Sequence, residues 1–132
     1  MRRIVPVAAM SCFLAGCACG DVRVANVDPR NPGVSVVDGM HIVVDQEPLY
    51  FSRGMKDVMI TWRLPADSAY RFPRDGITIR DAGGEFTRCH PEQNGLRFSC
   101  LNVHTKPGTY KYTIKVVGTP AVPELDPTIV NY

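Results

Sequence analysis

The chain has 132 residues, with 15 Lys and Arg against 13 Asp and Glu and 45% hydrophobic residues. That length allows one domain with a substantial hydrophobic core, but not two. The small net charge of +2 argues against electrostatic binding of nucleic acid, which needs a basic face.

Residues 1–16 have the layout of a secretory signal peptide. Arg2 and Arg3 give a positive start, and an apolar run over residues 4–14 ends in small residues. This run is shorter than the about 20 residues that a membrane-spanning helix needs. Removal of residues 1–16 also removes both arginines and leaves 13 basic and 13 acidic side chains, so the mature chain is neutral.

The sequence LAGC at residues 14–17 resembles the lipobox of bacterial lipoproteins. The resemblance covers the first 17 residues and implies that Cys17 carries a lipid and becomes the new N-terminus. Two or three acyl chains would form a stable membrane anchor. By the same resemblance, Ala18 in place of an aspartate implies the outer membrane of a Gram-negative envelope, with the domain facing the periplasm. Cys12 belongs to the removed peptide, and Cys19 has no assigned role.

Residues 18–33 have little periodicity and end in turn formers, which predicts a flexible tether. A short strand over residues 22–27 is an alternative within it. We therefore expect three parts. They are a lipoprotein signal peptide at residues 1–16, a lipidated N-terminus with its tether at 17–33, and a β domain at 34–132.

From residue 34 onward the pattern is that of β-structure. Asp38-Gly39 separates two apolar runs, which predicts a hairpin. Residues 57–64 alternate, with Trp62 on the apolar side, and residues 109–117 alternate between aromatic or aliphatic residues and Lys or Thr. No window of 11 or more residues after residue 33 keeps a helical period.

Shorter strands are expected near residues 76–80, 85–89 and 96–102, separated by glycine-containing turns. Seven or eight short strands in about 100 residues predict an all-β fold, a single immunoglobulin-like or cupredoxin-like β-sandwich with Trp62 between the sheets. Pro120, Pro123 and Pro127 cannot serve a central strand. They predict that residues 118–132 form an extended edge or a loop over the body.

Cys89 and Cys100 flank a ten-residue segment and are expected to form a disulfide, because a secreted chain reaches an oxidising compartment. A two-residue turn at Asn94-Gly95 would place the two cysteines opposite each other. Pro91 would then occupy a hydrogen-bonded position without an N–H to donate. A longer loop over residues 91–95, or a bulge, is therefore expected.

Residues 98–117 also resemble the copper-binding corner of cupredoxins, in which a cysteine ends one strand and a histidine follows in the loop. The resemblance implies Cys100 and His104 as copper ligands, with His90 or His41 as the third. It also implies the alternative function, a cupredoxin-like copper-binding or electron-transfer protein. The axial methionine of that family is missing after His104. A sulfur in a disulfide cannot also bind copper, so the main prediction includes no metal or other cofactor.

No nucleophile elbow, zinc motif or phosphate-binding glycine loop is present, and we predict that the chain is not an enzyme. The expected role is a non-catalytic binding or structural module that contacts an envelope protein. Tyr70, Arg71, Phe72 and Arg74 in a loop between strands are the candidate partner contact. The alternative is that both aromatic rings cap the sandwich and the arginines are solvated.

Overall fold

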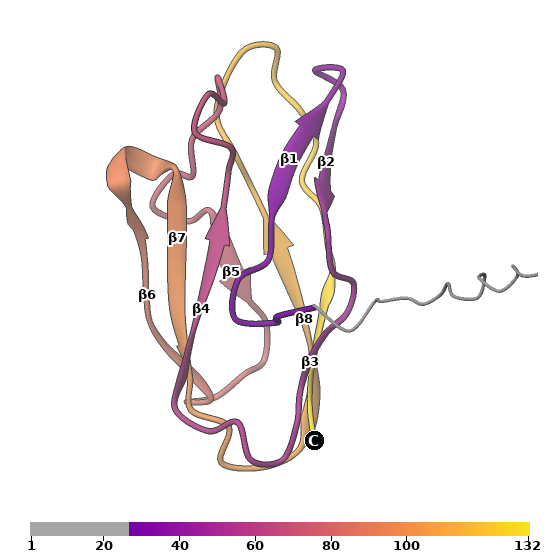
Figure 1. Cartoon of the computed structure of the whole chain (residues 1–132), viewed down its shortest axis with the longest axis vertical. Coiled ribbons are helices and arrows are strands. Elements are labelled where there is room, and N and C mark those ends of the chain that lie inside the picture. Colours follow the sequence, from indigo (N-terminus) through magenta and orange to yellow (C-terminus); the bar gives the residue numbers. More distant parts are fainter. Residues whose placement is uncertain (1–26) are drawn as a thin grey trace, which may run out of the picture.

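The computed structural model describes residues 27–132, so Cys17 and the predicted strand at 22–27 lie outside the described residues (Figure 1). Nine strands make up this part of the chain: β1 (Val34–Val37), β2 (His41–Val44), β3 (Leu49–Phe51), β4 (Val58–Arg63), β5 (Ile77–Ile79), β6 (Phe86–Glu92), β7 (Arg97–Asn102), β8 (Gly108–Ile114) and β9 (Thr128–Asn131). The one helical segment in it is a 3₁₀ turn, η3 (Gln93–Gly95). None of the described residues belongs to a helix long and apolar enough to cross a membrane.

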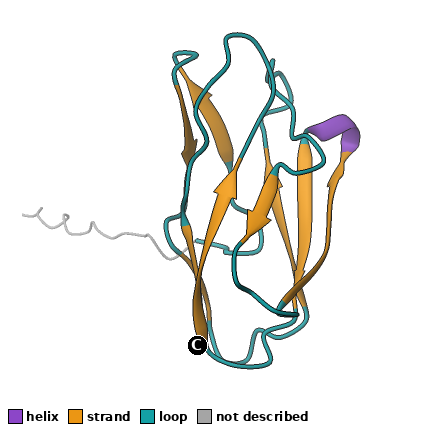
Figure 2. Cartoon of the chain, turned by 180° about the vertical axis from the view of Figure 1, so that it is seen from behind, coloured by secondary structure: helices purple, strands orange, loops and turns teal. Residues whose placement is uncertain are grey.

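The strands form three sheets. β1 and β2 pair as a hairpin, β4, β7 and β6 form a three-stranded sheet, and the four-stranded sheet has the order β3-β9-β8-β5. All neighbours are antiparallel except β3 and β9, which run in parallel. The molecule is elongated along its strands, and the loops gather at its two ends (Figures 1 and 2). The predicted all-β class is confirmed.

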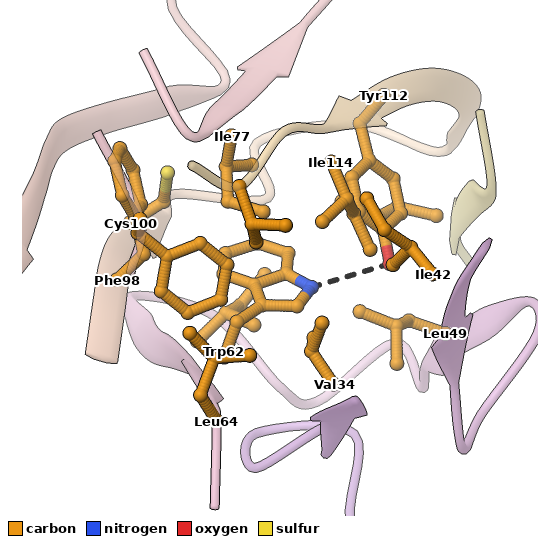
Figure 3. Close-up of a cluster of buried hydrophobic side chains, with 14 of the residues drawn as sticks. Val34, Ile42, Leu49, Trp62, Leu64, Ile77, Phe98, Cys100, Tyr112 and Ile114 are labelled. Atoms are coloured by element: carbon orange, nitrogen blue, oxygen red, sulfur yellow. Dashed lines mark hydrogen bonds between the residues drawn. The ribbon is translucent and has the colours of Figure 1, made fainter. Parts of the chain in front are cut away.

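One hydrophobic core joins the sheets, and Trp62 of β4 lies within it (Figure 3). The Trp62 side chain is fully buried, as is that of Tyr112 on β8. The indole Nε1 donates a hydrogen bond of 3.2 Å to the Tyr112 hydroxyl, which links the three-stranded sheet to the four-stranded one. Burial raises the pKa of Tyr112, so its hydroxyl stays neutral. The polar nitrogen of the buried Trp62 ring therefore has a hydrogen-bond acceptor inside the core.

The strongest sequence patterns are confirmed by the strands that they predicted. The hairpin turns at Asp38-Gly39, where both residues have a positive φ. In β8, Tyr110, Tyr112 and Ile114 are buried while Lys111 is exposed. Alternation with a period of two thus predicted correctly which face of β8 packs against the core.

The prediction that residues 118–132 form an edge or a draped loop is wrong for their last part. Thr128–Asn131 form β9, an interior strand between β3 and β8. The three prolines precede this strand, so none has to donate within it. The second neighbour of β9 is β3, a three-residue strand that the sequence pattern did not reveal.

The structure also differs from the predicted tether boundary, because residues 28–33 are bonded to the body of the domain. The Thr61 and Arg63 amides donate to the carbonyl oxygens of Arg30 and Pro32, so this segment runs beside β4. Farther along, the Gly33 amide donates to the Asp45 carboxylate at 2.9 Å. The domain therefore begins before residue 34.

Replacing Tyr112 with phenylalanine should destabilise the domain, because it leaves the buried Trp62 N–H without an acceptor. We expect a loss of about 1–3 kcal/mol in the free energy of unfolding, measured by urea denaturation. Tyr110→Phe is the matched control, since Tyr110 also lies on β8 but its hydroxyl has no hydrogen-bond partner among residues 27–132. Equal losses for the two variants would contradict a role for the Trp62–Tyr112 bond.

Candidate functional site

The predicted disulfide is present and joins Cys89 of β6 to Cys100 of β7, with a Cα–Cα distance of 4.1 Å. From the turn end, Glu92, Pro91 and His90 pair in one register with Arg97, Phe98 and Ser99. The register then shifts between Thr87 and His90, so that Arg88 and Cys89 together face Cys100. The predicted bulge is therefore present.

The predicted longer loop over residues 91–95 is replaced by a shorter connection, because β6 continues through Pro91 to Glu92. Proline is tolerated there since β6 is an edge strand with a single neighbour, β7. The disulfide joins an exposed cysteine, Cys89, to a fully buried one, Cys100. It therefore fastens an edge strand to the core of the domain.

The β6–β7 turn packs against the loop that contains residues 70–74. The Phe72 amide donates to the Gly95 carbonyl oxygen at 2.7 Å. Gly95 has φ +84°, and a Cβ there would lie 2.9 Å from both the Arg71 Cβ and the Phe72 carbonyl oxygen. Only glycine fits this close contact. The β6–β7 hairpin that carries the disulfide (the disulfide hairpin) and the loop of residues 70–74 therefore pack as one unit.

Within that loop the structure buries both aromatic side chains. Tyr70 is 6% exposed and Phe72 is 3% exposed, and the Tyr70 hydroxyl donates to the Pro120 carbonyl oxygen. The Arg71 guanidinium donates to the carbonyl oxygens of Ser68 and Tyr70 at 2.6 and 2.7 Å. Arg74 is exposed. The rings thus pack as core residues, and only the two arginines keep atoms for a partner.

The residues implied by the cupredoxin resemblance do not converge. The Cys100 sulfur is bonded to Cys89, and His90 on the exposed edge lies 3.1 Å from the Glu92 carboxylate. His104 is buried, with Nδ1 2.8 Å from the Met55 carbonyl oxygen and Nε2 2.6 Å from that of Tyr132. Among residues 27–132, no three His, Cys, Asp or Glu side chains cluster as metal ligands.

The sequence did not predict a polar cluster of His90, Glu92 and Ser99 on the disulfide hairpin. Glu92 accepts a hydrogen bond from the Ser99 hydroxyl through Oε1, while its Oε2 faces the His90 ring. The carboxylate lies between serine and histidine, so the histidine does not reach the hydroxyl as a general base would. Ser99 is also 1% exposed. This arrangement ties β6 to β7 and offers no accessible nucleophile.

His104 also has a role that the sequence did not reveal. Its ring joins the loop before β4, through Met55, to the end of β9, through Tyr132. Its backbone has φ +57°, a conformation uncommon for residues other than glycine. No local sequence signal marks such a tie, because its partners are backbone atoms far along the chain.

Tyr70→Ala should unfold the domain more easily, because it removes a buried ring and its hydrogen bond. We expect a loss of about 3–5 kcal/mol, measured by urea denaturation. Arg74→Ala, at an exposed position of the same loop, is the control and should change stability by less than about 0.5 kcal/mol. An unchanged midpoint for Tyr70→Ala would show that the ring is free for a partner.

The double substitution Cys89→Ser with Cys100→Ser should lower the free energy of unfolding by about 3 kcal/mol, as expected for a loop of this length. Reductant should lower the stability of the unsubstituted protein but not that of the variant. With the disulfide intact, addition of Cu(II) should give no intense blue absorption, because that colour needs a free cysteine thiolate. A strong blue band would overturn the non-metal assignment.

Comparison with known proteins assigns no family to the chain. No model of a known protein family matches it, and no curated protein matches it. Its function is therefore inferred from its own residues and geometry.

Proposed function

We propose that the protein is a lipoprotein of the bacterial cell envelope, anchored to a membrane through Cys17, whose β domain is a non-catalytic binding or structural module. By the lipobox resemblance, the membrane is the outer membrane and the domain faces the periplasm. Its partner is a further component of the envelope.

The disulfide is the observation that carries this proposal. Cys89–Cys100 fastens an exposed edge strand, and such bonds persist in oxidising compartments rather than in the cytosol. The bond lies in the folded domain and is independent of the signal-like residues 1–16. Two separate parts of the chain therefore support the same localisation, outside the cytosol.

The finer fold assignment is an immunoglobulin-like sandwich. A three-stranded antiparallel sheet and a four-stranded sheet share one core, and a buried tryptophan lies between them, as in that architecture. The fold alone names no activity, since unrelated functions occur on such sandwiches. It does supply a rigid frame that holds loops at both ends of the molecule for contact.

The Ser–Glu–His cluster on the disulfide hairpin supports the non-catalytic part of the proposal, because its order does not suit nucleophilic catalysis. There, Glu92 separates the serine from the histidine, and Ser99 is buried. For contact with a partner, the loop offers the exposed Arg74 and part of Arg71. Arginine is a frequent anchor of interfaces, so this pair remains the proposed contact of the loop.

The anchor is tested by expressing the full chain and Cys17→Ser in a Gram-negative host. The unsubstituted protein should enter the detergent phase on phase partitioning and carry acyl mass on its N-terminal residue. Cys17→Ser should lose that mass and keep its signal peptide, because sulfur acylation precedes cleavage in this pathway. Mass spectrometry of the intact chain measures both.

Cys19→Ser is the matched control, since it removes a neighbouring thiol and should leave lipidation unchanged. An unsubstituted protein from membranes without N-terminal acyl mass would refute the anchor. Crosslinking in intact cells with the full chain, compared with an Arg71→Ala, Arg74→Ala variant, then tests the binding role. Identical crosslinked products from both would exclude these arginines as the contact.

A further inference from the structure

A small cavity of about 230 Å³ lies at the end of the molecule where three segments meet. Its walls come from the β3–β4 loop, the β7–β8 loop and the residue that follows β9, which all lie at the lower end in Figure 1. His104 holds these walls together through its contacts with Met55 and Tyr132. The cavity is therefore framed by fixed contacts between distant parts of the chain.

The groups around this cavity are strongly basic. Arg53, Lys56 and Lys106 line it, and no Asp or Glu of the described residues does. All three side chains are exposed, and none forms an ion pair within residues 27–132. Three cations around one small cavity repel each other, and an anion between them would replace that repulsion with attraction.

Two acidic side chains, Glu85 and Asp57, lie near this end, and neither lines the cavity. Glu85 is buried and accepts hydrogen bonds from the Thr105 amide and hydroxyl, which hold the pKa of Glu85 below its usual value, with Lys106 contributing through its charge. Asp57 follows Lys56 in the chain but does not line the cavity. The side chains that line the cavity therefore carry an excess of positive charge, which Glu85 reduces only from beside Lys106.

The size and the donors of the cavity indicate which anion it takes. Sites for drug-sized ligands occupy about 300–1,000 Å³, so this one suits a small ion or a head group. Arginine can donate to two oxygens at once, and lysine acts as a point charge. Three cations match a tetrahedral group with three terminal oxygens better than a carboxylate with two.

We propose that the cavity bounded by Arg53, Lys56 and Lys106 binds the phosphate group of a phosphoester. This deepens the proposed binding role and rests on it only for one source of the ligand, the lipid head groups of the anchoring membrane. The other source is a soluble phosphoester. Tyr50 and Tyr132 stack at 5.9 Å and are 51% and 54% exposed, so Tyr132 adds an accessible aromatic wall.

The test is an NMR titration of the full chain in non-ionic detergent with inorganic phosphate, against chloride at matched ionic strength. Saturating shifts should appear in the amides of residues 53–56 and 104–106. The double variant Lys56→Gln, Lys106→Gln should bind phosphate at least tenfold more weakly. The control variant Lys111→Gln, Lys115→Gln removes the same charge from β8 and its end, outside the cavity, and should bind as the unsubstituted protein does.

Two results would overturn the proposal: shifts that do not saturate, or equal weakening in both double variants. Arg53→Gln is a further single variant, and each variant is checked for an unchanged melting temperature. Phosphatidylglycerol added to the detergent micelles then separates the sources, because the acyl anchor holds every variant in the micelle alike. Shifts at the same amides that the cavity variant loses and the control variant keeps support a lipid head group. Absence of these shifts, with phosphate binding lost in the cavity variant, supports a soluble phosphoester. The lipidation of Cys17 is measured separately, so failure of either proposal is distinguishable.

Discussion

The domain depends on the burial of Trp62 between its sheets. A ring of that size can fill the space between two short-stranded sheets only if its N–H finds an acceptor, since an unpaired donor in the core is costly. Tyr112 supplies the acceptor from the opposite sheet, and the aliphatic side chains around the pair complete the core. The position of β4 relative to β8 is therefore set by packing and by one directional bond.

The elements that could be predicted from the sequence are those whose signal is local. The β1–β2 hairpin follows from Asp38-Gly39, and β8 follows from its alternation. β3 is only three residues long, too short for a period of two to stand out, and it exists because β9 pairs with it. The interior position of β9 could not be predicted from the prolines before it. Each proline restricts pairing at its own position but says nothing about residues 128–131.

The candidate site shows the same division. Cys89 and Cys100 could be paired from their spacing and the predicted oxidising compartment, because this disulfide joins residues only 11 positions apart in the sequence. The burial of Tyr70 and Phe72 could not be predicted, since their packing partners, Pro120 and the β6–β7 turn, come from distant segments. Likewise, the cavity near His104 draws on residues from 53 to 132, and no stretch of sequence carries its signature.

The hydrogen bonds that hold residues 28–33 beside β4 limit how far the domain can stand from a membrane. Val27 lies ten residue steps after Cys17, and a chain of that length spans at most about 33–36 Å when fully extended. With a lipid on Cys17, the domain would be confined to a thin layer along the bilayer. A partner in the same layer would meet it at a high effective concentration, whereas a partner fixed farther away would stay beyond its reach.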